Sequence, residues 1–345
     1  MNSLKIGPSR IGDNFPVFIV TEIGGNFSTY EQGRKLINSA ISCGANAVKI
    51  QTFKAENLVS KYATFNMPNV GGKKKQIDVI RKLELSKKIQ KKLFRYCKKK
   101  KITFFSTPSH ISDVDFLEEV GNEIYKIGSD DLTNLPLIEY VAKLQKPTII
   151  STGMSNLREV REVVRVFRRM KNQQLAILHC VSMYPHDPKY ANLSVIKKMK
   201  NEFKLPVGWS DHTLGIETCV AAATIGANIV EKHFTLNKKA KGPDHVLSAD
   251  PHELSKMVQN IRMVEKAIGS GIKKPAICEL GSRRNVRKSI VALQDIDIGT
   301  VITADLLEIK RPGIGASPNN LKKIIGKKTR RRIKKDKPIK FSYLK

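Results

Sequence analysis

Short apolar runs alternate with longer helical patterns eight times before residue 270, and this alternation limits the possible folds more than any other feature. The expected strands are 18–22, 47–53, 102–107, 124–129, 147–153, 175–180, 206–210 and 228–234. A helical pattern follows nearly every run, as in 29–43 and 252–268. Eight strand-then-helix units in ~250 residues are typical of a (β/α)8 or TIM barrel. The runs are almost continuously apolar, as expected of parallel strands buried on both faces.

A doubly wound open sheet is the competing fold. Such a sheet usually opens with a glycine-rich phosphate loop after its first strand, but here that turn reads Glu22-Ile-Gly-Gly-Asn26, which is not GxGxxG.

The composition changes after residue 270, where short β-like pieces, including 300–302, alternate with turns. We therefore expect a catalytic barrel over 1–272, a linker over 273–282 and a small, mostly β domain over 283–345.

The charge of the chain favours anionic partners. Its 345 residues include 62 Lys and Arg against 31 Asp and Glu, a formal net charge of +31. Nucleic acid, acidic membranes and phosphorylated or carboxylated substrates all suit such a protein. No window approaches the roughly 18 apolar residues of a membrane-spanning helix, and the N-terminus has no signal-peptide pattern. The five cysteines form no CxxC motif, which predicts a reducing cytoplasm.

Polar side chains gather at the C-terminal ends of the expected strands, where barrel enzymes keep their catalytic residues. Lys49 and Lys126 are the most informative, because they interrupt apolar strands and a buried lysine is costly unless it is paired or faces an anion. With nearby serines they could surround a phosphate and a carboxylate. The polar residues at these ends include Glu22, Gln51, Thr107, Ser129, Ser151, Ser182 and Ser210.

Two histidines end neighbouring strands. His212 follows the seventh strand and His233 ends the eighth, so the two imidazoles are expected at one mouth of the barrel. Paired histidines with nearby carboxylates suit Mn²⁺, Fe²⁺ or Zn²⁺; the alternative is a pair of hydrogen-bonded histidines. Asp244, in the polar loop 242–250, could reach a sugar hydroxyl or the metal, or belong to a solvated turn.

Taken together, these segments resemble the sialic acid synthase family, which includes N-acetylneuraminate, legionaminate and pseudaminate synthases. Members condense phosphoenolpyruvate with an N-acylated mannosamine-type sugar. The tail resembles the family's antifreeze-like (SAF) domain through 286–291 and 309–313. The motifs run in order over nearly the whole chain: 21–24, 48–53, 105–108, 125–129, 151–154, 178–185, 210–213, 230–235 and 242–244.

The resemblance implies roles for individual residues. Glu22, His212 and His233 would be catalytic, with the two histidines ligating a divalent metal, Mn²⁺ by family habit. Asp244 would hold the open-chain sugar with Glu22, and Arg311 from a partner subunit would bind its N-acyl group in a domain-swapped homodimer. The remaining substrate-binding set, mostly for the phosphoenolpyruvate trianion, is Lys49, Gln51, Thr107, Lys126, Ser129, Ser151, Ser182, Tyr184 and Ser210.

The implied reaction forms a C–C bond and cleaves the C–O bond to phosphate, with the metal as Lewis acid on the sugar aldehyde. The acceptor stays open between N-acetylmannosamine, its 6-phosphate and a diacetamido-trideoxy relative. Departures from the family pattern fall at Ser109, at Ser182 and at the pair Asp130-Asp131. The insertion 61–75 aligns poorly, so a substrate-contacting asparagine could be Asn66 or Asn69.

Two rival classes are set against this reading. A nucleic-acid-binding protein is suggested by nine basic residues in 86–101 and twelve in 321–345. These runs form no recognised nucleic-acid-binding module, and 87–101 alternates with apolar residues as the exposed face of a barrel helix would, so no nucleic-acid partner is expected. A metal-dependent barrel hydrolase would present more ligands than this histidine pair, and a Schiff-base aldolase would need a lysine of depressed pKa.

Overall fold

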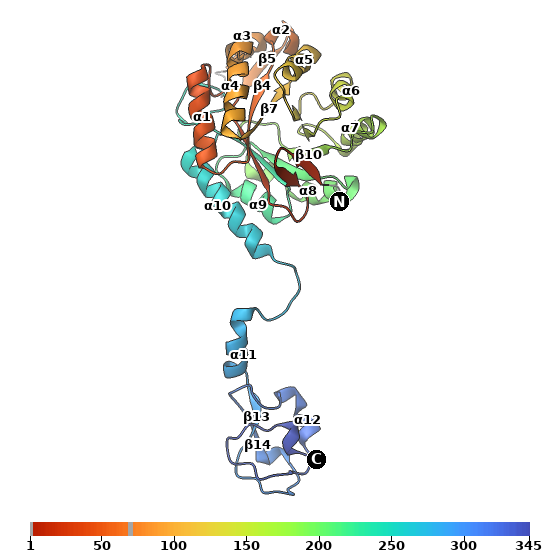
Figure 1. The fold of residues 1–345 in the computed structure, drawn as a ribbon, viewed down its shortest axis with the longest axis vertical. Helices are drawn as coiled ribbons and strands as arrows, with labels where there is room; N and C mark the ends of the chain where they lie inside the picture. The colour runs from red at the N-terminus through yellow and green to blue at the C-terminus, as the bar shows by residue number, and fades with distance from the viewer. Residues whose placement is uncertain (1–2, 68–71) are drawn as a thin grey trace. The chain divides into compact units, whose positions relative to one another are not determined.

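The computed structural model describes residues 3–67 and 72–345, and the side chains of all of these except 66, 67, 72 and 73. The chain divides into two compact units, Met1–Gly269 and Ser270–Lys345 (Figure 1). Within the described residues, no helix combines the length and the apolar composition needed to cross a bilayer.

Eight parallel strands of the first unit close into a barrel. Each strand pairs with the next one along the chain, and β12 pairs back onto β3. This closure confirms the predicted (β/α)8 fold. The strands are β3 (Phe18–Glu22), β4 (Ala47–Thr52), β7 (Thr103–Pro108), β8 (Tyr125–Ile127), β9 (Thr148–Ser151), β10 (Leu175–Cys180), β11 (Val207–Asp211) and β12 (Ile229–His233).

Helices follow the barrel strands and surround the sheet (Figure 1). Local sequence fixes where several of them start: Thr29 and Gln32 form a capping box at α1, and Asp250 and Glu253 form one at α10. The helices are α1 (Tyr30–Ser42), α4 (Lys87–Lys100), α5 (Ile111–Glu119), α6 (Leu135–Lys143), α7 (Leu157–Arg169), α8 (Ser194–Phe203), α9 (Glu217–Thr224) and α10 (Pro251–Ile268), with the 3₁₀ turn η3 (Pro188–Tyr190) before α8.

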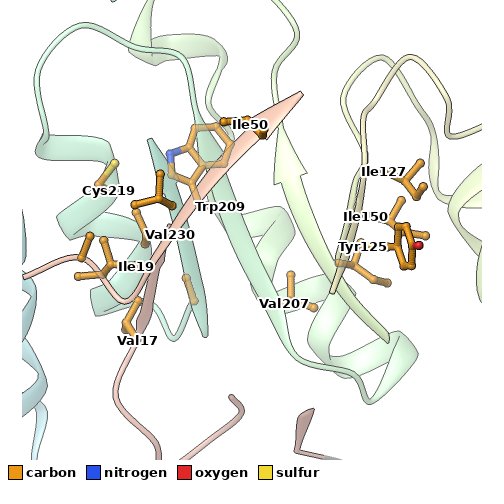
Figure 2. Close-up of a cluster of buried hydrophobic side chains, with 14 of the residues drawn as sticks. Val17, Ile19, Ile50, Tyr125, Ile127, Ile150, Val207, Trp209, Cys219 and Val230 are labelled. Atoms are coloured by element: carbon orange, nitrogen blue, oxygen red, sulfur yellow. The ribbon is translucent and has the colours of Figure 1, made fainter. Parts of the chain in front are cut away.

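Side chains alternate across each barrel strand, and this period of two sorts the core into two layers. Along β12, Val230 packs in the cluster between sheet and helices, together with Trp209 (Figure 2). Ile229 belongs instead to the apolar cluster inside the barrel, and Glu231 and His233 follow it on the same inner face, higher along the strand. The barrel interior is therefore apolar near the strand starts and polar near the strand ends.

A short antiparallel hairpin, β1 (Leu4–Ile6) and β2 (Ser9–Ile11), precedes the barrel. Its residues Leu4, Ile6 and Ile11 are buried in the same inner cluster as Phe18 and Ala47, which begin β3 and β4. The hairpin therefore covers the strand-start end of the barrel. This hairpin could not be predicted from the sequence, because three-residue strands carry too short a pattern.

The insertion after β4 contains its own small hairpin. It consists of α2 (Ala55–Leu58), β5 (Thr64–Met67), β6 (Gly72–Lys75), α3 (Gln76–Ile80) and the 3₁₀ turn η2 (Arg81–Leu83). Ser86 accepts a hydrogen bond from the Ile89 amide and starts α4 as a separate helix.

The second unit has a small core of its own, formed mainly by isoleucines such as Ile290, Ile302 and Ile339. β13 (Ser289–Ala292) pairs antiparallel with β14 (Leu307–Lys310). The expected strand 300–302 contributes only one isolated bridge, between Val301 and Lys328. The remaining elements are η4 (Ile277–Glu279) and α11 (Leu280–Val286), which lie where the linker was expected to end, and η5 (Ala304–Leu306), η6 (Pro318–Asn320), α12 (Leu321–Ile324) and η7 (Phe341–Tyr343).

Candidate active site

A cavity of about 560 Å³ opens where the barrel strands end. Asp244 lies next to it, with its Oδ2 atom 3.8 Å from His233 Nδ1. Arg311 belongs to the second unit. The structure brings twelve of the predicted site residues together in the cavity wall: Glu22, Lys49, Gln51, Thr107, Lys126, Ser129, Ser151, Ser182, Tyr184, Ser210, His212 and His233.

Two lysines and two glutamates form a buried charged cluster at the floor of this cavity. Lys49 donates to Glu22, and its Nζ lies 3.3 Å from Thr107 Oγ1 and 3.7 Å from Glu231 Oε1. Lys126 donates to the same Glu231 oxygen over 3.1 Å. Each lysine therefore has a carboxylate partner, which explains how two ammonium groups are tolerated inside the barrel.

Burial and pairing set the protonation of this cluster. Burial alone would raise the pKa of Glu231, but the two lysines lower it to about 2. Burial raises the pKa of Glu22, and the nearby charge of Glu231 raises it further, although Lys49 opposes this. Burial lowers the pKa of Lys126, partly offset by Glu231. Glu231 is therefore the fixed anion of the cluster, and Glu22 is the carboxylate that gains a proton more readily.

Glu231 is the important residue that the sequence analysis left without a role. Its function depends on contacts across the barrel, including one with Lys126, 105 residues away in the chain. Ser210 also donates to it, over 3.2 Å. The available signal was its place on β12, two residues before His233 on the same inner face.

Beside the charged cluster, hydroxyl groups form a cradle. The Oγ atoms of Ser151 and Ser182 are buried and have no hydrogen-bond partner among the described residues. The Gly153 amide donates to Ser129 Oγ over 2.9 Å. A Cβ atom on Gly153 would lie 2.2 Å from Ser182 Oγ and 2.9 Å from Ser129 Oγ, so a larger residue there would displace these hydroxyls. Buried, unsatisfied hydroxyls next to Lys126 indicate a site for a polar, anionic ligand.

The two histidines lie together in the cavity wall, with ring centroids 5.4 Å apart. His212 Nδ1 donates to the Val181 carbonyl over 2.8 Å, which leaves Nε2 as an acceptor. The ring of Tyr184 packs against that of His212, with the two ring centroids 3.9 Å apart. Burial lowers the pKa of His212 to about 4, and burial together with His212 lowers that of His233. Both imidazoles are therefore neutral at pH 7.

These side chains suit a divalent metal by their chemistry. His233 Nδ1 is buried without a hydrogen-bond partner, and neutral imidazole nitrogen is a common metal ligand. Burial and the charge of Glu22 raise the pKa of the neighbouring Asp244 to about 7. Among the described residues, no three His, Cys, Asp or Glu side chains form a preassembled metal site. Two histidines would thus leave coordination positions for water and substrate.

The insertion adds a mainly apolar wall that sequence reasoning missed. Leu58, Phe65, Ile80 and Leu83 line the cavity together with Gln76. Phe65 is in β5, directly opposite Lys74 of β6. Of the two candidate asparagines, Asn69 and the side chain of Asn66 lie outside the described residues.

Arg311 is exposed in a well-anchored loop of the second unit. It precedes Pro312 through a cis peptide bond. Ser289 Oγ donates to the Pro312 carbonyl over 2.6 Å and accepts from the Gly315 amide over 2.8 Å. The loop therefore holds its shape while the guanidinium stays accessible.

Comparison with known proteins places this geometry in a family. A model of the NeuB family matches residues 36–273, and a model of the SAF domain matches residues 287–345. The N,N'-diacetyllegionaminic acid synthase of Campylobacter jejuni is 40% identical, over 93% of this chain and 98% of that protein. The chain belongs to the NeuB family. The predicted resemblance, including the SAF domain, is confirmed.

Two further similar proteins support the assignment. The human N-acetylneuraminate-9-phosphate synthase is 33% identical, over 97% of this chain and 95% of that protein. The crystal structure of N-acetylneuraminic acid (sialic acid) synthetase from Leptospira borgpetersenii superposes with a TM-score of 0.75 at 33% identity. It covers 81% of this chain and 95% of its own.

Proposed function

We propose that this NeuB-family protein is a nonulosonic acid synthase that condenses phosphoenolpyruvate with an N-acylated mannosamine-type sugar and releases phosphate. The named relatives make the corresponding acids. The observation that carries the proposal is the serine cradle, whose unsatisfied Ser151 and Ser182 hydroxyls line the same cavity as the Lys126–Glu231 pair. Such a cradle fits the phosphate of a small, highly charged substrate.

Phosphoenolpyruvate would bind with its phosphate among Ser129, Ser151, Ser182 and Lys126. Its carboxylate would lie toward Lys49 and Thr107, which already form a hydrogen bond. Both lysines are held by carboxylates in the described structure, so the entering anion would share them with Glu22 and Glu231. This arrangement fixes the enol phosphate in one orientation before the sugar arrives.

The sugar would bind at the histidine side of the cavity. Mn²⁺ held by His212 and His233 would supply a Lewis acid for the aldehyde oxygen of the open-chain sugar. Asp244 and Tyr184 lie beside the two rings and would orient the sugar chain. Carbon 3 of the enol phosphate then attacks the aldehyde carbon, and positive charge develops at carbon 2.

Glu22 is placed to manage the water that completes the reaction. One of its oxygens accepts from the Gly24 amide over 2.5 Å, and the other accepts from Lys49. Its raised pKa favours uptake of a proton from water that adds at carbon 2. Phosphate then leaves from the tetrahedral intermediate, which cleaves its bond to carbon. The fixed negative charge of Glu231 would stabilise the developing cation.

The oligomeric part of the proposal concerns Arg311. Its anchored loop would reach the sugar's N-acyl group from a partner subunit, so that two chains build each site. The five cysteines are free thiols, and four of them are buried, which supports a reducing, cytoplasmic location as part of the same proposal.

A phosphate-release assay tests the proposed function. The full chain is incubated with Mn²⁺, phosphoenolpyruvate and each of three sugar classes: N-acetylmannosamine, its 6-phosphate and a 2,4-diacetamido-trideoxy hexose. We expect phosphate release that requires one of these sugars, together with a keto-acid product of matching mass. Release at the same rate without sugar would indicate a phosphatase and contradict the proposal.

A further inference from the structure

A second buried ion pair lies on the outer side of the barrel wall, behind the histidines. Asp211 ends β11 and Lys232 is the penultimate residue of β12, directly opposite it in the strand register. Their side chains are 0% and 1% exposed, and Lys232 Nζ lies 2.7 Å from Asp211 Oδ2. Because side chains alternate along a strand, the pair faces the helices and takes no part in lining the cavity.

The pair is tied to the loop that carries His212. Asp211 Oδ1 accepts from the Thr213 amide over 3.1 Å and from the Thr213 hydroxyl over 3.0 Å. Lys232 Nζ donates to the Thr213 carbonyl over 2.5 Å. Thr218 and Cys219 of α9 donate to the same carboxylate. The backbone on both sides of His212 is therefore fixed by one carboxylate and one ammonium group.

Lys232 also directly precedes the second histidine, because it lies between Glu231 and His233 in β12. The bonds of its ammonium group therefore hold the backbone beside His233 as well. Two residues earlier on each of these strands, the side chains that point outward are Trp209 and Val230, and both pack in the apolar layer. Apolar packing alone is therefore sufficient to hold the strands and helices together at that level. A buried ion pair adds little net stability compared with apolar residues of similar volume. What this pair adds is a set of directed hydrogen bonds between two histidine-bearing segments.

We propose that Asp211 and Lys232 are positioning residues that hold His212 and His233 in a fixed relative orientation for a divalent metal. The metal site itself rests on the proposed function. The two residues touch neither substrate nor metal and act only through the backbone of their neighbours. Outer partners of this kind typically change metal affinity about 10- to 100-fold when they are removed.

The test replaces the pair by apolar residues of similar size. The double variant Asp211→Leu/Lys232→Met removes the directed bonds but leaves no charge unpaired. We expect Mn²⁺ affinity, measured by electron paramagnetic resonance on the full chain, to fall roughly 10- to 100-fold at a near-native melting temperature. In the metal-free protein, we expect the proton on His212 Nδ1 to exchange faster with solvent by NMR, since its bond to Val181 depends on the fixed loop.

The matched control is Thr52→Val. Thr52 is a buried polar residue that hydrogen-bonds Gln90 and Ser106 on the outside of the barrel, between β4 and β7. This variant should leave both readouts unchanged. If the double variant does not fold, Asp211→Asn, which keeps the shape but not the charge, is measured in the same way and should show the same direction of change.

Unchanged Mn²⁺ affinity and unchanged proton exchange in a folded variant would overturn the proposal, as would an equal loss in Thr52→Val. The result is separable from the proposed function. If the wild-type protein released no phosphate with any sugar, the synthase assignment would fail, while a change in His212 proton exchange would still support the positioning role.

Discussion

The two units of this chain bury their polar residues very differently. The first unit contains two buried ion-paired networks. Lys49 and Lys126 pair with two glutamates inside the barrel, and Lys232 pairs with Asp211 on the side of the strands that faces the helices. In the second unit, the buried polar residues among those described are only Ser289 and Thr329, and both make hydrogen bonds to backbone. Charged side chains of that unit, including Arg311, remain on its surface.

This difference separates two kinds of contribution to function. Burying a charge is costly, so a fold retains buried ion pairs where they do something that apolar packing cannot. The barrel therefore contains the groups that shift protonation and orient reactants. The second unit offers a rigid loop with an exposed guanidinium, which suits recognition of a neutral acceptor such as an N-acyl carbonyl. The following predictions test this division, starting with the largest expected effect.

Loss of a buried histidine should remove the barrel's chemistry. We expect His233→Ala to lower kcat by roughly 10³-fold or more, because a Lewis acid supplies several kcal/mol of charge stabilisation. Chelation should abolish wild-type activity, and Mn²⁺ should restore it. His252→Ala, at an exposed position of α10, is the control and should retain activity. Full turnover in excess chelator, with metal analysis showing none bound, would contradict this prediction.

Removal of the second unit should leave a folded barrel with little activity. Truncation near residue 275, or Arg311→Ala in the full chain, should lower kcat/KM roughly 100-fold, since the sugar loses one anchoring contact. Mixed dimers of Arg311→Ala and His233→Ala chains should regain part of the activity, because one of their two sites would be intact. No recovery after subunit exchange, shown by mass spectrometry, would place Arg311 outside the partner's site.

Lys126 tests the anion-binding half of the cavity. Lys126→Met should raise the KM for phosphoenolpyruvate far more than the KM for the sugar, because a charge-assisted contact contributes about 1.5–3 kcal/mol. Lys143→Met, at an exposed lysine of α6, is the matched control. Small, equal changes for both substrates would make Lys126 a structural residue that only balances Glu231.

Gly153 tests the same half through shape alone. Gly153→Ala should weaken phosphoenolpyruvate binding by about tenfold, since the added methyl group would overlap Ser182 Oγ and displace the cradle. Gly281→Ala in the second unit meets no atom within 4 Å and should change nothing measurable in the same titration. Wild-type affinity in Gly153→Ala would place the anion elsewhere.

The last prediction concerns Asp244, whose raised pKa should make the stability of the folded protein depend on pH. Its folded pKa of about 7 lies above the usual value of 3.8 for a free aspartate carboxyl, so the folded state binds its proton more tightly. Stability should therefore fall as pH rises from 4 to 7, and this fall should be absent in Asp244→Asn. Chemical denaturation of the metal-free proteins at both pH values measures it. A stability difference between the two proteins that does not change with pH would contradict the raised pKa of Asp244.

Much of the barrel follows from the sequence, because its signal is local. A strand such as β8 is recognised from Tyr125 and Ile127 flanking an inward Lys126. The same alternation brings residues of eight separate segments into one cavity. The features that the sequence did not predict depend on contacts between residues far apart in the chain. The role of Glu231 depends on two lysines from other strands, and the cavity's apolar wall depends on how the insertion folds back.

The central claim is that the barrel condenses phosphoenolpyruvate with cleavage of its C–O bond. Phosphoenolpyruvate carrying ¹⁸O in the bridging oxygen tests it directly, with the released phosphate analysed by ³¹P NMR or mass spectrometry. Since water adds at carbon 2 before phosphate leaves, we expect the label in phosphate and a strict requirement for the sugar. Label retained in the keto-acid product would show P–O cleavage and contradict the account.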